Sequence, residues 1–178
     1  ANPEDVYSRI TVTNRGPDPV EIHVLPHLWY RNTWSWESAQ AAPRITKCGD
    51  GAAMTTHPVI GDRWFTVNAS TGEVPALLFC ENETNNALLF GSTNASATTK
   101  DGINDYVVHG DVDAVSTTAG SKVAAHVHAT LAPDETLTVT VRFAPAEMTS
   151  PFDDADTVLA QRKAEADAFY DAVAAADL

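Results

Sequence analysis

Two alternating segments near the end of the chain, Lys122 to Leu131 and Thr136 to Phe143, constrain the fold more than any other feature. Each places apolar residues at every second position, which is the period of a β-strand with one buried face. These apolar faces hold Val123, Ala125, Val127, Ala129 and Leu131 in the first segment, and Leu137, Val139, Val141 and Phe143 in the second. Turn-forming residues, Ala-Pro-Asp-Glu at 132–135, separate them. The sequence therefore predicts two strands joined as an antiparallel hairpin.

Shorter segments of the same kind precede this pair. Residues 8–13 alternate and are followed by a run of turn formers at 14–19. Residues 20–30 form a longer apolar run, in which Pro26 lacks a backbone donor and therefore predicts a bulge or an edge strand. Further strands are predicted at residues 63–68, 76–81 and 87–90. Because no helical period separates these segments, we expect a mainly β fold, an antiparallel β-sandwich.

The end of the chain has a helical period instead. Residues 153–175 contain strong helix formers and no Gly or Pro, and carboxylates at the start favour the positive end of a helix dipole. A narrow stripe at helical spacing consists of Val158, Leu159, Arg162, Ala166, Phe169 and Val173. We therefore expect a sandwich domain over residues 1–150 and a C-terminal α-helix within residues 151–178. This helix either connects to another domain or packs back on its own sandwich.

Composition and charge exclude several classes of function. The 178 residues carry a net charge of −13, which repels nucleic acid and anionic lipid, so we expect neither as a partner. No stretch approaches the roughly 20 apolar residues of a membrane span. The chain enters a strand pattern within a few residues of its start, as an excised segment would. Cys48 and Cys80 fit no metal or redox motif, and we expect two buried free thiols, which favours a reducing compartment such as the cytoplasm.

The densest cluster of chemistry-bearing residues is Leu-Trp-Tyr-Arg-Asn-Thr-Trp-Ser-Trp at residues 28–36. Indole faces stack on the C–H faces of sugars, while Arg and Asn bond hydroxyl groups. Candidate carbohydrate contacts are therefore Trp29, Arg31, Asn32, Trp34 and Trp36. Alternatively, the three tryptophans fill the core of the sandwich or cover an interface with a neighbouring domain.

Carboxylates gather in a second region, between residues 81 and 106. Glycoside hydrolysis needs a pair of carboxyl groups roughly 5 to 9.5 Å apart, and Glu81, Glu83, Asp101 and Asp105 are candidates for such a pair. Runs of Asp, Asn and Gly are equally typical of solvated turns, which is the interpretation that the sequence favours. We therefore assign no catalytic residue.

Metal and cofactor motifs are weak in this sequence. His126 and His128 share one strand face and could chelate a metal together with His109 or an Asp, but half-buried strand histidines are common, so no metal site is predicted. A nucleophile elbow and a phosphate-binding glycine loop are both absent from the sequence, and no cofactor is expected.

Several of these segments together resemble a known family. The matching motifs are residues 9–17, 23–36, 81–85 and 89–91, then Lys-Asp-Gly-Ile-Asn-Asp-Tyr-Val-Val-His-Gly at 100–110, and the helical residues 162–170. Together they resemble bacterial glucosidase-like proteins related to glycoside hydrolase family 63. The resemblance implies an N-terminal β-supersandwich that packs on an (α/α)6 catalytic toroid of the same parent chain. The chain would then be a fragment that ends at the linking helix, in a bacterial cytoplasmic protein.

The resemblance also implies a function. The parent enzyme would hydrolyse an α-glucosidic bond with inversion, using carboxylates of the toroid, and the fragment alone would be inactive. Lys100, Asp101, Asn104 and Asp105 would belong to a loop at the rim of the parent's active site, in contact with an oligosaccharide. Two alternatives stay open: a stand-alone carbohydrate-binding module that uses the tryptophans, and a sandwich with no ligand.

Overall fold

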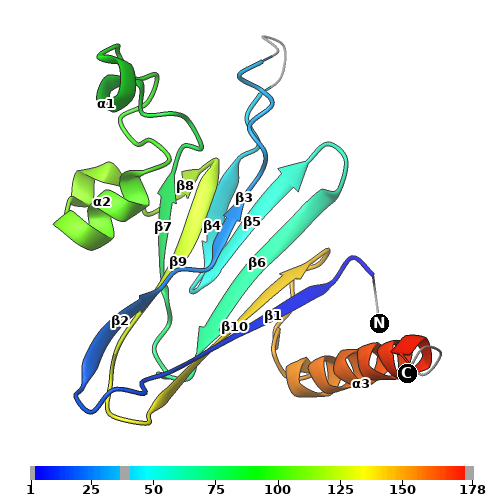
Figure 1. The fold of residues 1–178 in the computed structure, drawn as a ribbon. Coiled ribbons are helices and arrows are strands. Elements are labelled where there is room, and N and C mark those ends of the chain that lie inside the picture. Colours follow the sequence, from blue (N-terminus) through cyan, green and yellow to red (C-terminus); the bar gives the residue numbers. More distant parts are fainter. Residues whose placement is uncertain (1–2, 37–40, 175–178) are drawn as a thin grey trace.

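The computed structural model describes residues 3–36 and 41–174, which form two antiparallel sheets with helices at their periphery (Figure 1). The strands are β1 (Val6–Thr13), β2 (Val20–Val24), β3 (His27–Trp29), β4 (Ile45–Gly49), β5 (Ala52–His57), β6 (Gly61–Ala69), β7 (Ala76–Cys80), β8 (Ala119–Gly120), β9 (Lys122–Leu131) and β10 (Thr136–Ala144). The helices are α1 (Asn86–Phe90), α2 (Gly102–His109), the short 3₁₀ turn η1 (Val112–Ala114) and α3 (Ala155–Ala174).

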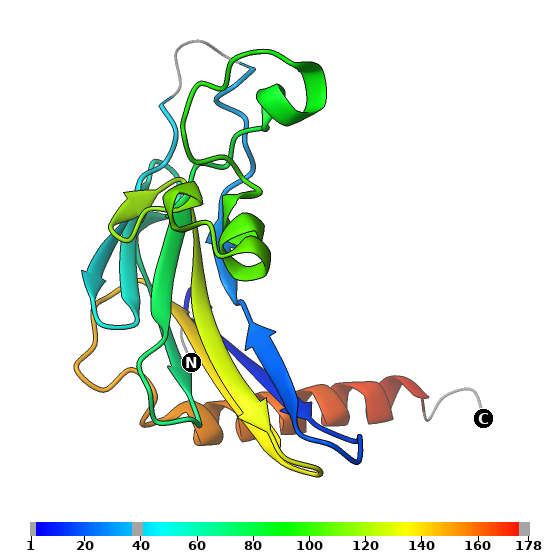
Figure 2. The same cartoon turned by 90° about the vertical axis from the view of Figure 1, so that its left-hand side faces the viewer.

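The two sheets confirm the predicted sandwich with a C-terminal helix. One sheet has six strands in the order β1-β10-β6-β5-β4-β8, and in the other β9 pairs with β2, β3 and β7 (Figure 2). The core between them contains alternate residues of both central strands, as the sequence predicts, together with Ile45, Phe65 and Phe79. A second apolar cluster lies on the outer face of the β9 sheet, where Ile103 of α2 packs against Leu78, Cys80 and Ala124.

The predicted hairpin of β9 and β10 is wrong. Both strands form, but β9 pairs with β2, β3 and β7, whereas β10 pairs with β1 and β6 in the opposite sheet. Residues 132–135 therefore cross from one sheet to the other, beside the crossing from β1 to β2. Asn14 joins the two crossings, because its side-chain Nδ2 donates to the carbonyl of Leu131 at 3.0 Å and its backbone N–H donates to Glu135 at 3.0 Å. The apolar faces thus meet across the core instead of side by side.

Pro26 lies on an edge strand, as predicted. Val24 lies opposite Val127 and His27 lies opposite Ala124, so β2 and β3 follow one continuous register along β9. Pro26 itself lies in the break between β2 and β3, where it lacks a backbone donor, and its carbonyl accepts a hydrogen bond from Ala125 N–H at 3.0 Å.

Three local predictions need correction. Residues 87–90 belong to the helix α1 and not to a strand, because Asn85 caps the N–H of Leu88 and Gly91 ends the helix in the left-handed region at φ 67°. Asp101 to Tyr106 is not a loop, because α2 begins at Gly102. Strands β4, β5 and β8, which form one side of the larger sheet, were not predicted.

Helix α3 is held to the sandwich only by its first turns. Ala155 is buried and Val158 and Leu159 are half-buried, but the helix from residue 160 to 174 is exposed, and it extends beyond the edge of the sandwich in Figure 1. Complete packing of the helix on its own sandwich, one of the two expected arrangements, is therefore wrong. In the described part of the chain, α3 and the other helices lack the length and apolar character needed to cross a membrane.

Candidate functional site

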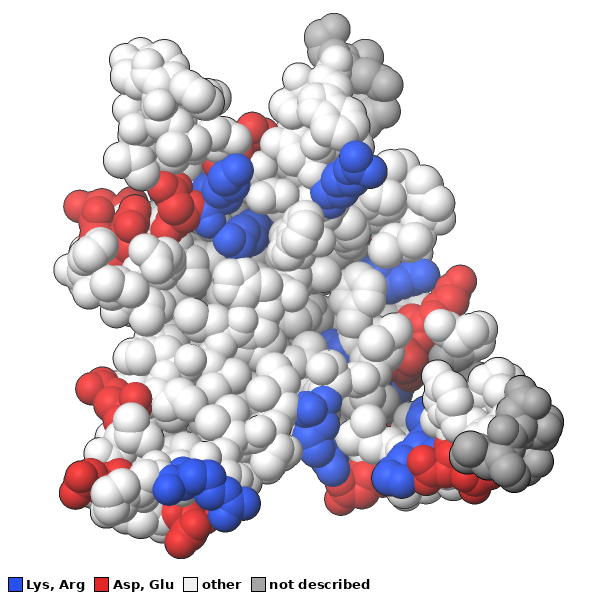
Figure 3. Space-filling model, in the orientation of Figure 1, with Lys and Arg blue, Asp and Glu red and all other residues white. Residues whose placement is uncertain are grey.

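Two loops carry most of the predicted site residues to the same end of the sandwich. Because β3 and β7 are both antiparallel to β9, they run in the same direction and the chain leaves both at one end. We call this the loop end; it comprises residues 30–36, 41–44 and 81–101, at the top of Figure 1. In the space-filling view it forms two protrusions, with Lys and Arg atoms around the recess between them (Figure 3).

Glu83 and Asn82 join the two loops. The indole Nε1 of Trp34 donates to Glu83 Oε1 at 2.6 Å, and Asn32 Nδ2 lies 3.2 Å from Glu83 Oε2. The amide of Asn32 also donates to the carbonyl of Asn82 at 2.9 Å, and Asn82 Nδ2 donates to the carbonyl of Tyr30 at 2.9 Å. Asn32 and Trp34 therefore hold the two loops of the loop end together, and we call this set of hydrogen bonds the frame of the loop end.

The three tryptophans of residues 28–36 have different surroundings. Trp34 is half-buried, whereas Trp29 is 55% exposed and Trp36 is 68% exposed. The guanidinium carbon of Arg31 lies 5.1 Å from the centre of the Trp36 ring, which is a cation–π contact. Trp29 and Trp36 are thus available to a ligand or to another domain, and placement of all three indoles in the core is wrong.

A groove runs beside the first loop. It has a volume of about 690 Å³ and is lined by Tyr30, Arg31, Trp34, Arg44 and His57, among others. The His57 ring stacks on Tyr30 with centroids 4.7 Å apart. Ligand clefts of about 300–1,000 Å³ accommodate small molecules, so the groove is large enough for a sugar.

The second group of predicted site residues is divided by α2. Lys100 and Asp101 stay with the loop end, where the N–H of Lys100 donates to the carbonyl of Glu83 at 3.0 Å and its Nζ lies 3.3 Å from Thr84 Oγ1. Asn104 and Asp105 lie on α2, and Asp105 borders a different hollow together with Asp111 and Asp113. Asn85 and Thr99, which donate to Asp101, line the same hollow as Asp105, so Asp101 and Asp105 are neighbours at the start of α2.

The candidate carboxylates are occupied by donors of the chain itself. Ser121 donates to Glu81 Oε2 from its hydroxyl at 2.6 Å and from its N–H at 3.2 Å. Arg44 lies 3.1 Å from Glu81 Oε1. Asp101 accepts from Thr99 Oγ1 at 2.6 Å and from Asn85 Nδ2 at 2.8 Å.

The pKa of Asp101 also indicates a structural and not a catalytic role. Partial burial opposes ionisation of this group, but the hydrogen bonds from Thr99 and Asn85 outweigh it and lower the pKa of Asp101 below its usual range. A general acid requires a raised pKa. The lowered pKa thus agrees with the interpretation that these acidic residues form turns and do not act as a catalytic acid.

A histidine cluster lies outside the loop end, on the outer face of the β9 sheet. His126 and His128 share that face, as predicted, but His109 lies at the end of α2 and is not part of the cluster. His23 and Glu21 of β2 take its place, and among the described residues Glu21, His23 and His128 have ligand atoms within 4.8 Å of one another. Glu21 and His23 are not among the ligands predicted from the sequence, although they lie two residues apart on one strand and so share a face.

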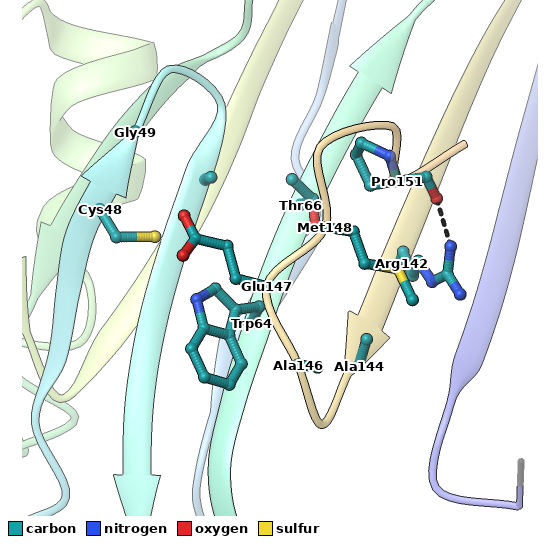
Figure 4. A pocket seen from close by; sticks show the side chains of 11 residues that line it. Cys48, Gly49, Trp64, Thr66, Arg142, Ala144, Ala146, Glu147, Met148 and Pro151 are labelled. Atoms are coloured by element: carbon teal, nitrogen blue, oxygen red, sulfur yellow. Dashed lines mark hydrogen bonds between the residues drawn. The ribbon is translucent and has the colours of Figure 1, made fainter. Parts of the chain in front are cut away.

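The two cysteines are free and differ in burial. Cys80 is buried, as expected, and burial raises the pKa of its thiol to about 11. Cys48 is exposed, which corrects the expectation that both are buried. Cys48 borders a small cavity of about 70 Å³ beneath residues 144–151, where Trp64, Glu147 and Met148 also point (Figure 4). This cavity is below the volume range of ligand clefts.

Comparison with known proteins adds one relative. No protein-family model matches the chain. The chain is 30% identical over 204 residues to the uncharacterized protein YMR196W of Saccharomyces cerevisiae (strain ATCC 204508 / S288c), and the alignment covers 95% of this chain and 19% of the yeast protein. The chain thus spans about a fifth of the length of the curated relative that it matches.

Proposed function

We propose that the chain is a non-catalytic accessory β-domain of a glycoside hydrolase, related to glycoside hydrolase family 63. In this proposal it packs on an (α/α)6 catalytic domain of the same parent chain and borders the entrance for an α-glucoside. The parent would hydrolyse the glucosidic bond with inversion. The motifs at residues 23–36 and 100–110 support this assignment, and the alignment with a much longer yeast protein is compatible with it.

The observation that carries the proposal is the large apolar surface at the loop end. In α1, Leu88 is 73% exposed, Leu89 is 59% exposed and Phe90 is 73% exposed. The exposed Trp29 and Trp36 add two indoles at the same end of the sandwich. Large apolar side chains that are exposed next to one another, as in α1, are typical of an interaction site. Because internal hydrogen bonds fix the loops that present it, the surface is suited to packing against a second domain.

The hydrogen bonds of the carboxylates support a role in shaping a site and not a catalytic role. Glu81, Glu83 and Asp101 each accept hydrogen bonds that hold neighbouring segments in place. Their removal would disrupt the frame of the loop end before it affected any acid or base. Acid and base groups would therefore come from the catalytic domain.

The test uses the full-length parent enzyme, one double variant and one control variant. Leu88→Ser combined with Phe90→Ser should lower kcat/KM for an α-glucoside and separate the unfolding of the two domains. Val20→Ser, at the opposite end of the sandwich, is the control and should change neither. The isolated chain should not cleave α-glucosides. Turnover by the isolated chain that disappears with Glu81→Gln or Asp101→Asn would refute the proposal.

A stand-alone carbohydrate-binding module is the second candidate function. The groove favours it, because Arg31 lines the groove and contacts the exposed Trp36, and an indole next to a guanidinium group is suited to a sugar. Calorimetry with maltooligosaccharides distinguishes the two candidates. Millimolar or tighter binding that is lost in Trp36→Ala would support the module, and absence of binding would support the accessory domain.

A further inference from the structure

Four side chains on two adjacent strands form a compact group on the outer face of the β9 sheet. Glu21 and His23 alternate along β2, and His126 and His128 alternate along β9. His23 lies directly opposite His128 in the strand register. Their rings are parallel to within 2°, with centroids 4.5 Å apart. This histidine cluster shares no residue with the loop end, and its interpretation does not depend on the proposed function.

The distances converge on one position. Nε2 of His128 lies 2.6 Å from Glu21 Oε1, and Nε2 of His23 lies 3.9 Å from the same oxygen. One ligand atom from each of these residues lies within 4.8 Å of the other two. Ligands of a tetrahedral zinc ion at 2.0–2.2 Å are about 3.4 Å apart, so small side-chain rotations would complete the site.

We propose that Glu21, His23 and His128 bind one divalent transition-metal ion of the Zn²⁺ class. Two imidazoles and one carboxylate are a frequent set of zinc ligands. Nitrogen donors select zinc, nickel or copper over magnesium and calcium, which prefer oxygen ligands. Water would complete the coordination, because all three residues are exposed.

His126 and the sheet beneath the cluster preorganise the ligands. Nε2 of His126 lies 2.8 Å from Nδ1 of His23, so it orients the ring while Nε2 of His23 points toward Glu21. Strands β2 and β9 pair over five successive residues, and Val24 and Val127 anchor them in the core. Ligands on paired strands are held more rigidly than ligands on loops. A bound ion would therefore join the edge strand β2 to the centre of its sheet.

The experiment measures metal binding by the chain after treatment with EDTA and removal of the chelator. Isothermal titration with ZnCl₂ should give one ion per chain, whereas CaCl₂ and MgCl₂ should give no heat of binding. His23→Asn and His128→Asn should each weaken Zn²⁺ binding by at least about tenfold, since each removes a direct ligand and even a supporting residue contributes about 10- to 100-fold. Glu21→Gln should also weaken it.

His109→Asn is the matched control, because it removes an exposed histidine outside the cluster, and it should leave the affinity unchanged. Circular dichroism of each variant without metal checks that the sheets are intact. A second measurement is the melting temperature. It should rise with Zn²⁺ concentration in the unsubstituted chain and not in His128→Asn. Absence of Zn²⁺ binding, or binding that His23→Asn and His128→Asn leave unchanged, would overturn the proposal.

Discussion

Replacing Arg142 should destabilise the sandwich and release α3 from it. The side chain is 3% exposed and lies on β10, where it reaches three acceptors. Its Nε donates to Asp5 Oδ1 at 3.0 Å and its second terminal nitrogen donates to Asp5 Oδ2. Its Nη1 donates to the carbonyl of Pro151 at 2.7 Å, as Figure 4 shows, and lies 3.2 Å from Asp154 Oδ1. Arg142 thus ties the start of the chain and the start of α3 to one strand.

The magnitude follows from what each acceptor would lose in Arg142→Met. The single hydroxyl proton of Tyr7 can serve either the carbonyl of Pro151 at 2.9 Å or Oδ1 of Asp154 at 2.5 Å, and the exposed Asp154 can also be solvated by water. Asp5 is the costly group, because its side chain is only 17% exposed and both of its oxygens lose a charged donor. A charged hydrogen bond contributes about 1.5–3 kcal/mol and a broken buried ion pair costs about 3–5 kcal/mol, so we expect about 3 kcal/mol of lost unfolding free energy.

Urea unfolding followed by tryptophan fluorescence and circular dichroism measures this loss. Arg15→Met is the control: Arg15 and Asp134 form an ion pair at 3.3 Å with side chains 79% and 82% exposed, and such pairs contribute about 0–1 kcal/mol. A protease should cleave the segment before α3 faster in Arg142→Met than in the unsubstituted chain. A loss in Arg142→Met no larger than in Arg15→Met would refute the reasoning.

Three further predictions follow from single positions. In native protein, a thiol reagent should modify the exposed Cys48 and spare Cys80, whose pKa burial raises to about 11; equal rates for both would contradict this. A Cβ on Gly120 would lie 2.4 Å from the backbone oxygen of Cys80. Gly120→Ala should therefore lower the urea midpoint by the equivalent of about 1–3 kcal/mol. Gly49→Ala is the control and should be nearly neutral, because the nearest atom to its Cβ would be 3.7 Å away. The folded-state pKa of Asp101 lies below its usual value of 3.8, so ionised Asp101 stabilises the fold above that pH and this contribution is lost as the pH falls further. Asp101→Asn should therefore reduce the urea midpoint at neutral pH and reduce it less in acid.

The sequence predicts the faces of the strands well but not their pairing. Alternation is a local property, so Val123, Val127 and Val139 are buried as expected. Whether residues 132–135 join neighbours in one sheet or cross between sheets depends on distant contacts, such as those of Asn14 with this crossing. An antiparallel hairpin and a crossing between sheets place the same apolar residues toward the core, and therefore produce the same sequence pattern.

Errors in the shorter elements have local causes. Leu88 to Phe90 looks like a buried strand because its residues are apolar, yet Asn85 and Gly91 are typical helix-capping residues and would have indicated a helix. Strand β5 contains small and weakly polar residues, so its alternation has little hydrophobic contrast. The amide and indole donors to Glu83 come from residues about 50 positions away in the chain, and no local pattern contains such a contact.

The pattern of donors around the loop end also limits where acid–base chemistry could occur in a parent enzyme. A catalytic acid must present its proton to a leaving group, and a catalytic base must reach the proton that it accepts. Glu83 receives the indole of Trp34 on one oxygen and the amide of Asn32 on the other. Asp101 likewise receives donors on both oxygens. In the proposed parent enzyme, either group would first have to give up a hydrogen bond that holds the loop end in place, which favours carboxylates of another domain as the acid and base.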